Sequence, residues 1–284
     1  MTLAEPPAPA DQPVNFREPP VTEVVLAMQF ERAAIDLEVL ADFATRVKAD
    51  FPQRDQRPPL PPMAEDFSKA VAEPEFSLEL ASRFEMPRTW FSSADGTRIL
   101  QLQEDRLVFN WQRAHPNDAD YPRYLKLREA FRERLAQLLE SIEAAGGDVP
   151  GTNFCEVTYV NQMELGEDDP VGASTLADIL APLDNPEYAF LPFPEDQRYG
   201  ARFLIPEDGE SRGRLYVNAA PAARPDGTSM YVMNLTSRLK PRDSSPGSAW
   251  DALDLGRNWI VQGFVDLTTK KMHERWGYKE GVDG

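Results

Sequence analysis

Cysteine and histidine are both scarce in this sequence, which narrows the chemistry that it can support. Cys155 is the only cysteine, so the chain cannot form a disulfide within itself. His115 and His273 are the only histidines, which excludes a histidine-rich metal site. Chains without disulfides are typical of a reducing compartment, so we expect a cytoplasmic protein rather than a secreted one.

Long apolar runs are missing as well. No segment approaches the roughly 20 apolar residues that a membrane-spanning helix requires. Residues 1–11 have neither the basic start nor the apolar stretch of a secretion signal. The sequence therefore predicts neither a transmembrane helix nor export.

Positive charge is in deficit, because 47 acidic residues stand against 30 basic ones and give a formal net charge of −17. Direct contact with nucleic-acid phosphates or an anionic membrane depends on lysine and arginine, so we expect neither partner. An acidic mimic of nucleic acid would need carboxylates along one face, whereas the acids here are scattered. Solubility is the simpler interpretation of the charge.

Phosphate-binding loops and nucleophile motifs are absent, since the sequence has no GxGxxG, no GxxxxGKS/T and no GxSxG. Cys155 lies in an alternating segment, where a small buried side chain is a better interpretation than a nucleophile. His115, Asp118 and Asp120 could hold a hard cation, but a solvated turn with Asp120 as a helix cap fits better. The sequence thus predicts no catalytic residue, no metal and no other cofactor.

A regular succession of strand and helix patterns is present instead. In the first half, a β-branched run, an apolar helical stripe and a tight turn between alternating segments predict a strand, a helix and a hairpin. A long stripe that ends at a glycine pair predicts a second helix. The predicted strands are Val21–Phe30, Phe76–Leu80, Arg88–Phe91, Arg98–Gln103 and Arg106–Trp111, and the predicted helices are Leu37–Phe51 and Asp120–Ala145.

The second half repeats this order. Its predicted strands are Phe154–Val160, Glu187–Phe190, Arg198–Ile205, Arg214–Ala219 and Met230–Arg238, and its predicted helices are Ser174–Leu180 and Ala249–Trp276. Each half is then β-α-ββββ-α, which predicts an α+β fold with an internal duplication. We expect two similar halves to form one curved antiparallel sheet with the long helices on one face.

The expected division of the chain follows from this pattern. Residues 1–15 are rich in proline and alanine and predict a disordered N-terminal tail. The first half covers residues 16–147 and the second covers residues 148–284, and we expect the two to form one continuous unit.

A proline-rich segment interrupts the first half. Residues 52–74 contain six prolines, four of them at 58, 59, 61 and 62. Such a segment is either a PxxP recognition site in polyproline II form or an extended connector laid over the surface. We favour the connector because the segment lies inside a folded unit.

Polar and aromatic residues on the predicted strands are the best candidates for a ligand site. Tyr159 and Asn161 flank Val160, and an arginine-bearing strand follows after residue 197. If one face of the sheet is open, these residues would line it beside Asn110; an ordinary wet sheet face is the alternative. The candidate ligand-binding residues are Tyr159, Asn161, Arg198, Tyr199, Arg202 and Trp111.

Several segments spread over nearly the whole chain carry a family resemblance. They are PPVTEVVLAMQF near the start, RILQLQEDRLVFNW, YPRYLKLREAFRERL, VTYVNQM, and LGRNWIVQGFVDLTTKKMHERWG at the end. The chain resembles a sporadically distributed family of uncharacterised bacterial proteins of about this size. Members have an N-terminal PP-x-x-E-V strand, a central Y-x-N strand and a C-terminal I-x3-F-x2-L-T helix.

The chain departs from that family at two places. The family has arginine before the central tyrosine and after the asparagine, where this chain has Thr158 and Gln162. It has histidine in the last helix, where this chain has Arg257. The resemblance implies the fold and residence in the cytoplasm, and it implies no particular activity.

Two functions are compatible with these observations. The first is a non-catalytic binding or regulatory module that contacts another protein, and an exposed patch around Trp250, Trp259 or Trp276 would support it. The second is a small-ligand protein or enzyme with an arginine-lined pocket between sheet and helices, acting on an acidic molecule. We expect the first, because no catalytic motif is visible.

Overall fold

The computed structural model describes residues 15–31, 34–67, 86–113, 121–164, 175–183, 189–192 and 194–279. The predicted strand at residues 76–80, the turn around His115 and the N-terminal tail up to residue 14 lie outside these residues. The fold is α+β, with one large antiparallel sheet and five helices among the described residues. No helix among them is both long and apolar enough to cross a membrane.

Eleven strands are present in the described part of the chain. They are β1 (Asn15–Phe16), β2 (Val21–Phe30), β3 (Gln53–Arg57), β4 (Arg88–Ser92), β5 (Arg98–Gln103), β6 (Arg106–Gln112), β7 (Thr152–Glu164), β8 (Tyr199–Glu207), β9 (Glu210–Ala223), β10 (Ser229–Leu239) and β11 (Tyr278–Lys279). The helices are α1 (Leu37–Val47), α2 (Tyr124–Ala144), α3 (Leu176–Ile179), α4 (Pro246–Leu267) and α5 (Lys270–Arg275).

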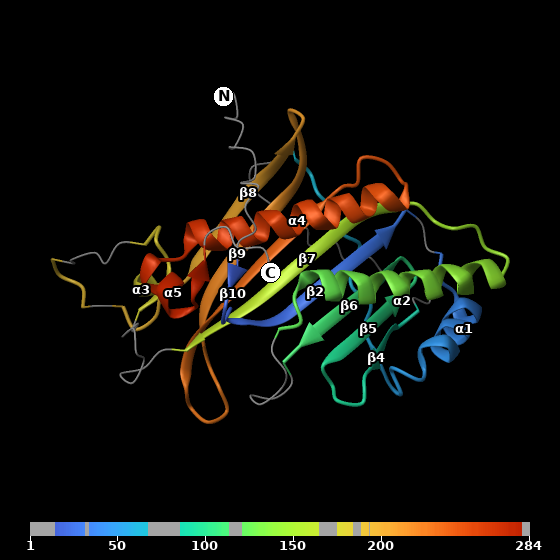
Figure 1. The fold of residues 1–284 in the computed structure, drawn as a ribbon, viewed down its shortest axis with the longest axis horizontal. Coiled ribbons are helices and arrows are strands. Elements are labelled where there is room, and N and C mark those ends of the chain that lie inside the picture. The colour runs from blue at the N-terminus through green and yellow to red at the C-terminus, as the bar shows by residue number, and fades with distance from the viewer. Residues whose placement is uncertain are drawn as a thin grey trace.

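Nine strands form the large, twisted sheet in the order β3-β4-β5-β6-β2-β7-β10-β9-β8 (Figure 1). Strands β2 and β7, from the two halves of the sequence, pair at its centre, with Leu26 opposite Val157. The long helices α2 and α4 lie over the same face, as Figure 1 shows, and we call this the helix face. The remaining strands, β1 and β11, form a separate two-stranded sheet from the two ends of the described chain.

The main hydrophobic core lies between the helix face and the helices. Alternate residues of the central strands point into it, because successive side chains of a strand leave opposite faces. Phe109 of β6 stacks against Phe131 of α2 with ring centroids 6.4 Å apart. On the other side, the thiol of Cys155 donates to the carbonyl oxygen of Ala249 in α4 over 3.3 Å. One continuous core therefore anchors both helices to the sheet.

The opposite face, which we call the outer face, is crossed by residues 58–67. We call this segment the proline-rich strap. Gln103 exchanges two hydrogen bonds with the backbone of Leu60, each 3.0 Å long. Gln29 does the same with the backbone of Met63, at 2.6 and 3.2 Å. These residues therefore lie over the sheet, where the interpretation as a connector laid over the surface expects them.

Several strand predictions need correction. Gln53–Arg57, inside the proline-rich segment, forms β3, an edge strand whose residues are all exposed. Its charged pattern gave no apolar signal, and pairing with β4 creates the strand. Residues 189 and 190 of the predicted strand Glu187–Phe190 lie in a bend, and the rest of it lies outside the described residues. Among the described residues, three strands rather than four therefore lie between α3 and α4.

The helix ends also differ from the predictions. Helix α2 begins at Tyr124, with Arg123 rather than Asp120 at its N-cap. Thr175, not Ser174, caps α3 through a capping box with Asp178. The single helix predicted from 249 to 276 is two helices, because the carbonyl of Ile179 accepts a hydrogen bond from the amide of Thr269, which caps α5. Docking of α3 at this point ends α4.

Candidate functional site

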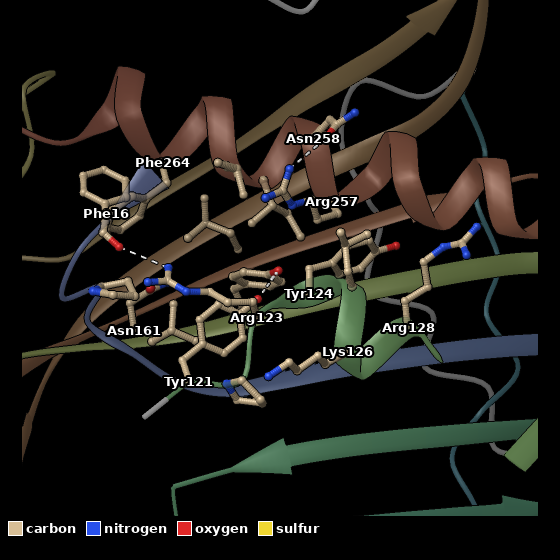
Figure 2. Close-up of a pocket in the computed structure, with 18 of the residues that line it drawn as sticks. Phe16, Tyr121, Arg123, Tyr124, Lys126, Arg128, Asn161, Arg257, Asn258 and Phe264 are labelled. Carbon is tan, nitrogen blue, oxygen red and sulfur yellow. Dashed lines mark hydrogen bonds between the residues drawn. The ribbon is translucent and has the colours of Figure 1, made fainter. Parts of the chain in front are cut away.

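A pocket of about 900 Å³ opens between the helix face of the sheet, the start of α2 and the middle of α4. This volume is within the range of small-molecule sites in proteins. Strand β7 contributes to its floor, α4 forms one wall, and the residues around β1 form the rim (Figure 2). The lining residues are Phe16, Pro19, Pro20, Val21, Tyr121, Pro122, Arg123, Tyr124, Leu125, Lys126, Arg128, Tyr159, Asn161, Leu235, Asp254, Arg257, Asn258, Ile260, Val261 and Phe264.

Tyr159 and Asn161 of β7 are the most deeply buried polar residues of the pocket, 5% and 2% exposed. Both lie on the helix face because they are two residues apart on one strand. The hydroxyls of Tyr159 and Tyr121 form a 2.8 Å hydrogen bond. The amide of Asn161 donates to the carbonyl oxygen of Met233 over 3.2 Å. Tyr121, in the segment before α2, and Met233, on β10, therefore hold these side chains in place.

Positive charge predominates in the pocket. Four cationic side chains line it, against the single carboxylate of Asp254, so the formal charge of the lining is +3. Asp254 accepts hydrogen bonds from the hydroxyl of Tyr124 at 2.7 Å and from Nε of Arg128 at 2.8 Å. The carboxylate of Asp254 therefore already has a cationic partner, Arg128, and a hydroxyl donor, Tyr124. The pocket thus attracts negative charge in a protein whose net charge is −17.

Arg257 and Arg123 have no carboxylate partner among the described residues. Arg257, on α4, donates from Nη1 to the side-chain oxygen of Asn258 over 3.1 Å and lies over the ring of Tyr124. Its Nε is buried and has no hydrogen-bond partner in the described structure. Arg123, at the exposed mouth, donates from Nη1 to the carbonyl oxygen of Phe16 over 3.1 Å. Both guanidinium charges remain available to an anion.

The start of α2 adds a second electropositive element. Arg123 is the N-cap and has φ 73° and ψ 151°, a strained conformation that few residues other than glycine adopt and that costs about 1–3 kcal/mol. No side chain caps this helix end. The first amides of the helix therefore depend on solvent or a ligand, and the helix dipole favours an anion there. The residues Arg123–Lys126 that form this end also line the pocket.

Burial sets the protonation of the pocket tyrosines. It is the largest cause that raises the pKa of Tyr121 and of Tyr159, although the charges of Arg257 and Arg123 lower both pKa values in opposition. Burial and the neighbouring Asp254 likewise raise the pKa of Tyr124. The three hydroxyls are therefore protonated at neutral pH, and they act as hydrogen-bond donors or acceptors rather than as bases.

An aromatic cluster supports the rim. Phe16 packs edge-on against Phe264, with ring centroids 5.6 Å apart, and also contacts His273 and Trp276. Burial lowers the pKa of His273, which contacts the hydroxyl of Thr268 over 2.8 Å. These contacts make His273 a structural residue of the cluster.

The predicted ligand-binding residues do not share one face. Tyr159 and Asn161 line the pocket, and Trp111 supports it from behind, with its ring 5.5 Å from that of Tyr121. Arg198 lies outside the pocket, and its side chain is 70% exposed. Arg202 is exposed. It lies opposite Tyr216 in the register of β8 and β9, on the outer face.

The remaining predicted residues separate in the same way. Tyr199 is half-buried against the core and does not line the pocket. Asn110 donates to Glu23 on the outer face, opposite to its neighbour Trp111. The expectation of a single open polar face was wrong because adjacent residues of a strand point to opposite sides.

Sequence reasoning missed the cations that the structure brings to Tyr159. Arg257 was noted as a departure from the family pattern and not as a site residue. The position of Arg257 in the sequence could have identified it, because it borders the buried stripe of α4 that contains Gly256 and Ile260. The signal of Arg123 was its place between two tyrosines at a helix start. A charged residue that borders the apolar stripe of a helix lies near the core, and it can therefore face a pocket beside that core.

Other chemistry has little support in the described part of the chain. No group of three or more histidine, cysteine, aspartate or glutamate side chains there is placed to hold a metal ion. Cys155 is buried, and burial raises the pKa of its thiol, which makes it a poor nucleophile at neutral pH.

Comparison with known proteins adds no relative: no protein-family model matches the chain, and no curated protein matches it significantly.

Proposed function

We propose that this protein binds a small organic anion in the pocket between α2, α4 and the sheet, and that it does so without transforming it. The observation that carries the proposal is a cavity of about 900 Å³ with a formal charge of +3 in its lining. Local positive charge in a strongly acidic protein selects anions electrostatically. The apolar share of the lining provides the contact area that small ligands need.

The residue types in the pocket favour binding over catalysis. The described residues that line it include no histidine, cysteine, serine or threonine. Asp254 is engaged by Tyr124 and Arg128, and the raised pKa values of the tyrosines make them poor bases. General acid–base catalysis works best with a group whose pKa is near the working pH, and these hydroxyls are not such groups.

The tryptophans favour a pocket over a protein interface. A protein-binding role would be supported by an exposed patch around Trp250, Trp259 or Trp276. Trp276 is 5% exposed, and the other two are half-buried and pack against the core. They contribute to the core of the fold rather than to a docking surface.

The segments that carry the family resemblance also meet at the pocket. Pro19 and Pro20 of the first motif lie at its rim, Tyr159 and Asn161 of the second at its floor, and Ile260 of the third in its wall. Thr158 and Gln162, which depart from the family pattern, alternate with the floor residues on β7 and so point to the outer face. Their departure does not change the pocket.

We also infer that the two halves of the chain arose by duplication, and that the pocket lies at their junction. The strand order supports this inference: β6, β5 and β4 follow β2 outward, as β10, β9 and β8 follow β7. Each half places one long helix, α2 or α4, on the same face (Figure 1). Both halves contribute lining residues, such as Arg123 and Arg257.

Native mass spectrometry of the protein purified gently from its source tests the binding function. We expect a stoichiometric small molecule on the wild-type protein. Val261→Trp should abolish this adduct, because Val261 lines the pocket and a tryptophan there fills it. Val232→Trp is the matched control. Val232 lies on the outer face of β10, whereas Leu235 of the same strand lies on the helix face and lines the pocket.

Two outcomes would reject the proposal. One is an adduct of equal occupancy on wild-type protein and on Val261→Trp, which would place the molecule elsewhere. The other is a stoichiometric protein partner with no small molecule, which would restore the protein-binding alternative.

A further inference from the structure

The proposed function leaves open how the anion is recognised, and the inference below rests on that function. Arg257 and Arg123 line the same pocket as the hydroxyl pair of Tyr121 and Tyr159, and they come from different elements. Arg257 comes from the wall formed by α4, and Arg123 comes from the start of α2. Their charges act on both hydroxyls, because each lowers both tyrosine pKa values against the larger effect of burial.

The hydroxyl pair has a hydrogen atom to spare. Two hydroxyls carry two protons, and the 2.8 Å contact between Tyr121 and Tyr159 uses one of them. The second proton is available to an acceptor in the pocket. A hydroxyl beside unpaired guanidinium groups is best matched by an oxyanion, because charge-assisted hydrogen bonds are shorter and stronger than neutral ones.

Arg257 has the donors that such an oxyanion needs. Its guanidinium carries five N–H donors; one from Nη1 is directed to Asn258, and a side-chain hydrogen bond from Arg257 is among the causes that lower the pKa of Tyr159 against burial. Its Nε is buried without a partner among the described residues, an arrangement that is costly unless a ligand completes it. Arg123 lies at the exposed mouth, where solvent screens its charge more strongly.

The rest of the pocket suits an apolar body. Aliphatic side chains of Val21, Leu235 and Ile260 lie among the rings of Phe16 and Phe264 in the lining. A bare inorganic anion would leave these walls without contacts. We infer that Arg257 and the Tyr121–Tyr159 hydroxyl pair hold the carboxylate or phosphate head of an organic anion, with Arg123 at the mouth and an aromatic or other apolar body against these walls.

Three matched probes test this assignment by isothermal titration calorimetry. Naphthoate, naphthyl phosphate and naphthylmethanol share one apolar body and differ in the head group. We expect at least one anion to bind wild-type protein about 10- to 100-fold more tightly than the alcohol, the range that hydrogen bonds to charged groups provide. The tighter of the two anions identifies the head group, and inorganic phosphate should bind more weakly than either.

Substitutions then show which residues cause the preference for the anion over the alcohol. Arg257→Gln should remove about 10-fold or more of the affinity for the anion and leave that for the alcohol unchanged. Arg123→Gln should remove less, about 3-fold, because of its exposure. Tyr159→Phe should reduce the affinity for the anion through loss of the hydroxyl pair. Arg198→Gln is the control with the same change in charge, and it should have no effect because that side chain lies outside the pocket.

Circular dichroism and thermal unfolding of each variant show whether it is folded before binding is compared. If all three probes bind wild-type protein equally and Val261→Trp blocks them, the pocket binds ligands but the anion assignment is wrong. An anion preference that survives in Arg257→Gln also overturns the assignment. If no probe binds, the assignment is rejected, and adduct detection by mass spectrometry decides the binding function separately.

Discussion

Two arginines of the outer face, Arg214 and Arg238, differ in their neighbours from two arginines of the pocket on the helix face. On the outer face, Arg214 donates to the carboxylate of Glu65 over 2.7 Å, and Arg238 contacts the same carboxylate at 3.3 Å and that of Glu156 at 2.7 Å. Glu65 belongs to the proline-rich strap, and its side chain is 1% exposed. On the helix face, Arg257 and Arg123 have no carboxylate partner among the described residues.

The difference separates a structural use of charge from a functional one. Buried ions are costly, and partners within the fold offset that cost on the outer face. The same partners hold the strap across the sheet, so the cluster fastens one part of the chain to another. On the helix face the buried Nε of Arg257 has no hydrogen-bond partner among the described residues, and it lies beside a cavity large enough for a ligand. Functional sites are where proteins tolerate such local conflict.

Removal of the strap carboxylate should have the largest effect. Glu65→Ala leaves Arg214 and the hydroxyl of Tyr216 without their main acceptor. We expect the free energy of unfolding to fall by about 3 kcal/mol, the cost of breaking a buried ion pair on one side. Urea unfolding measures this loss, and affinity of the folded variant for the anionic probe should not change.

An exposed ion pair provides the control for that substitution. Asp55 contacts Arg57 in β3, with side chains 60% and 50% exposed. Asp55→Ala should change stability by less than about 0.5 kcal/mol, since exposed pairs contribute little. Equal losses in Glu65→Ala and Asp55→Ala would show that the strap cluster is not structurally important.

Helix α4 matters for both stability and binding, because it packs closely on the sheet and carries Arg257. A side chain at Gly256 would collide with Ser237 and approach Leu239 Cδ1 to 2.9 Å. Gly256→Ala should therefore push α4 away from β10, lower the free energy of unfolding by about 1–3 kcal/mol and weaken binding of the anionic probe.

Gly247 in the first turn of the same helix is the matched control. A Cβ there has no atom within 4 Å, so Gly247→Ala should be neutral or slightly stabilising. The two variants are compared by urea unfolding and by calorimetry with the same probe. A loss of stability in Gly247→Ala as large as in Gly256→Ala would contradict the close-packing explanation.

Local patterns explain how much of the fold the sequence could predict. The hairpin of β5 and β6 was predicted with its turn at 104–105, because strand alternation and turn residues are encoded within 14 residues. Strand β3 was missed because its exposed polar residues become a strand only through pairing with β4. The division of the C-terminal helix was also missed, since it depends on docking of α3, far away in sequence.

The candidate site was predictable to the extent that it lies on one strand. Tyr159 and Asn161 were found because a polar pair at alternate positions is visible in a single segment. Arg198 and Arg202 lie outside the pocket, which could not be foreseen because the sequence does not say which strands are neighbours. Arg123 and Arg257 reach Tyr159 only through the pairing of β2 with β7 and the packing of two helices, and no local pattern encodes that geometry.

The smallest effect is expected for Arg257→Met, and its comparison with Arg214→Met is the most direct test of the difference between the two pairs of arginines. Arg214 and Arg257 each lie over an aromatic ring, of Phe67 at 5.3 Å and of Tyr124 at 5.6 Å. Replacement by methionine keeps much of the apolar contact and removes the charge. Arg214→Met should lower the free energy of unfolding by up to about 3 kcal/mol, because the buried carboxylate of Glu65 loses the nearer of its two arginine partners.

Arg257→Met, in contrast, should leave the free energy of unfolding unchanged or raise it by up to about 1 kcal/mol. The reason is that it removes a cation with a buried, unpartnered Nε and strands no carboxylate among the described residues. Urea unfolding without ligand measures both variants. A loss in Arg257→Met as large as that in Arg214→Met would mean that Asn258 and Tyr124 make this guanidinium structural, and the two faces would then use arginine in the same way.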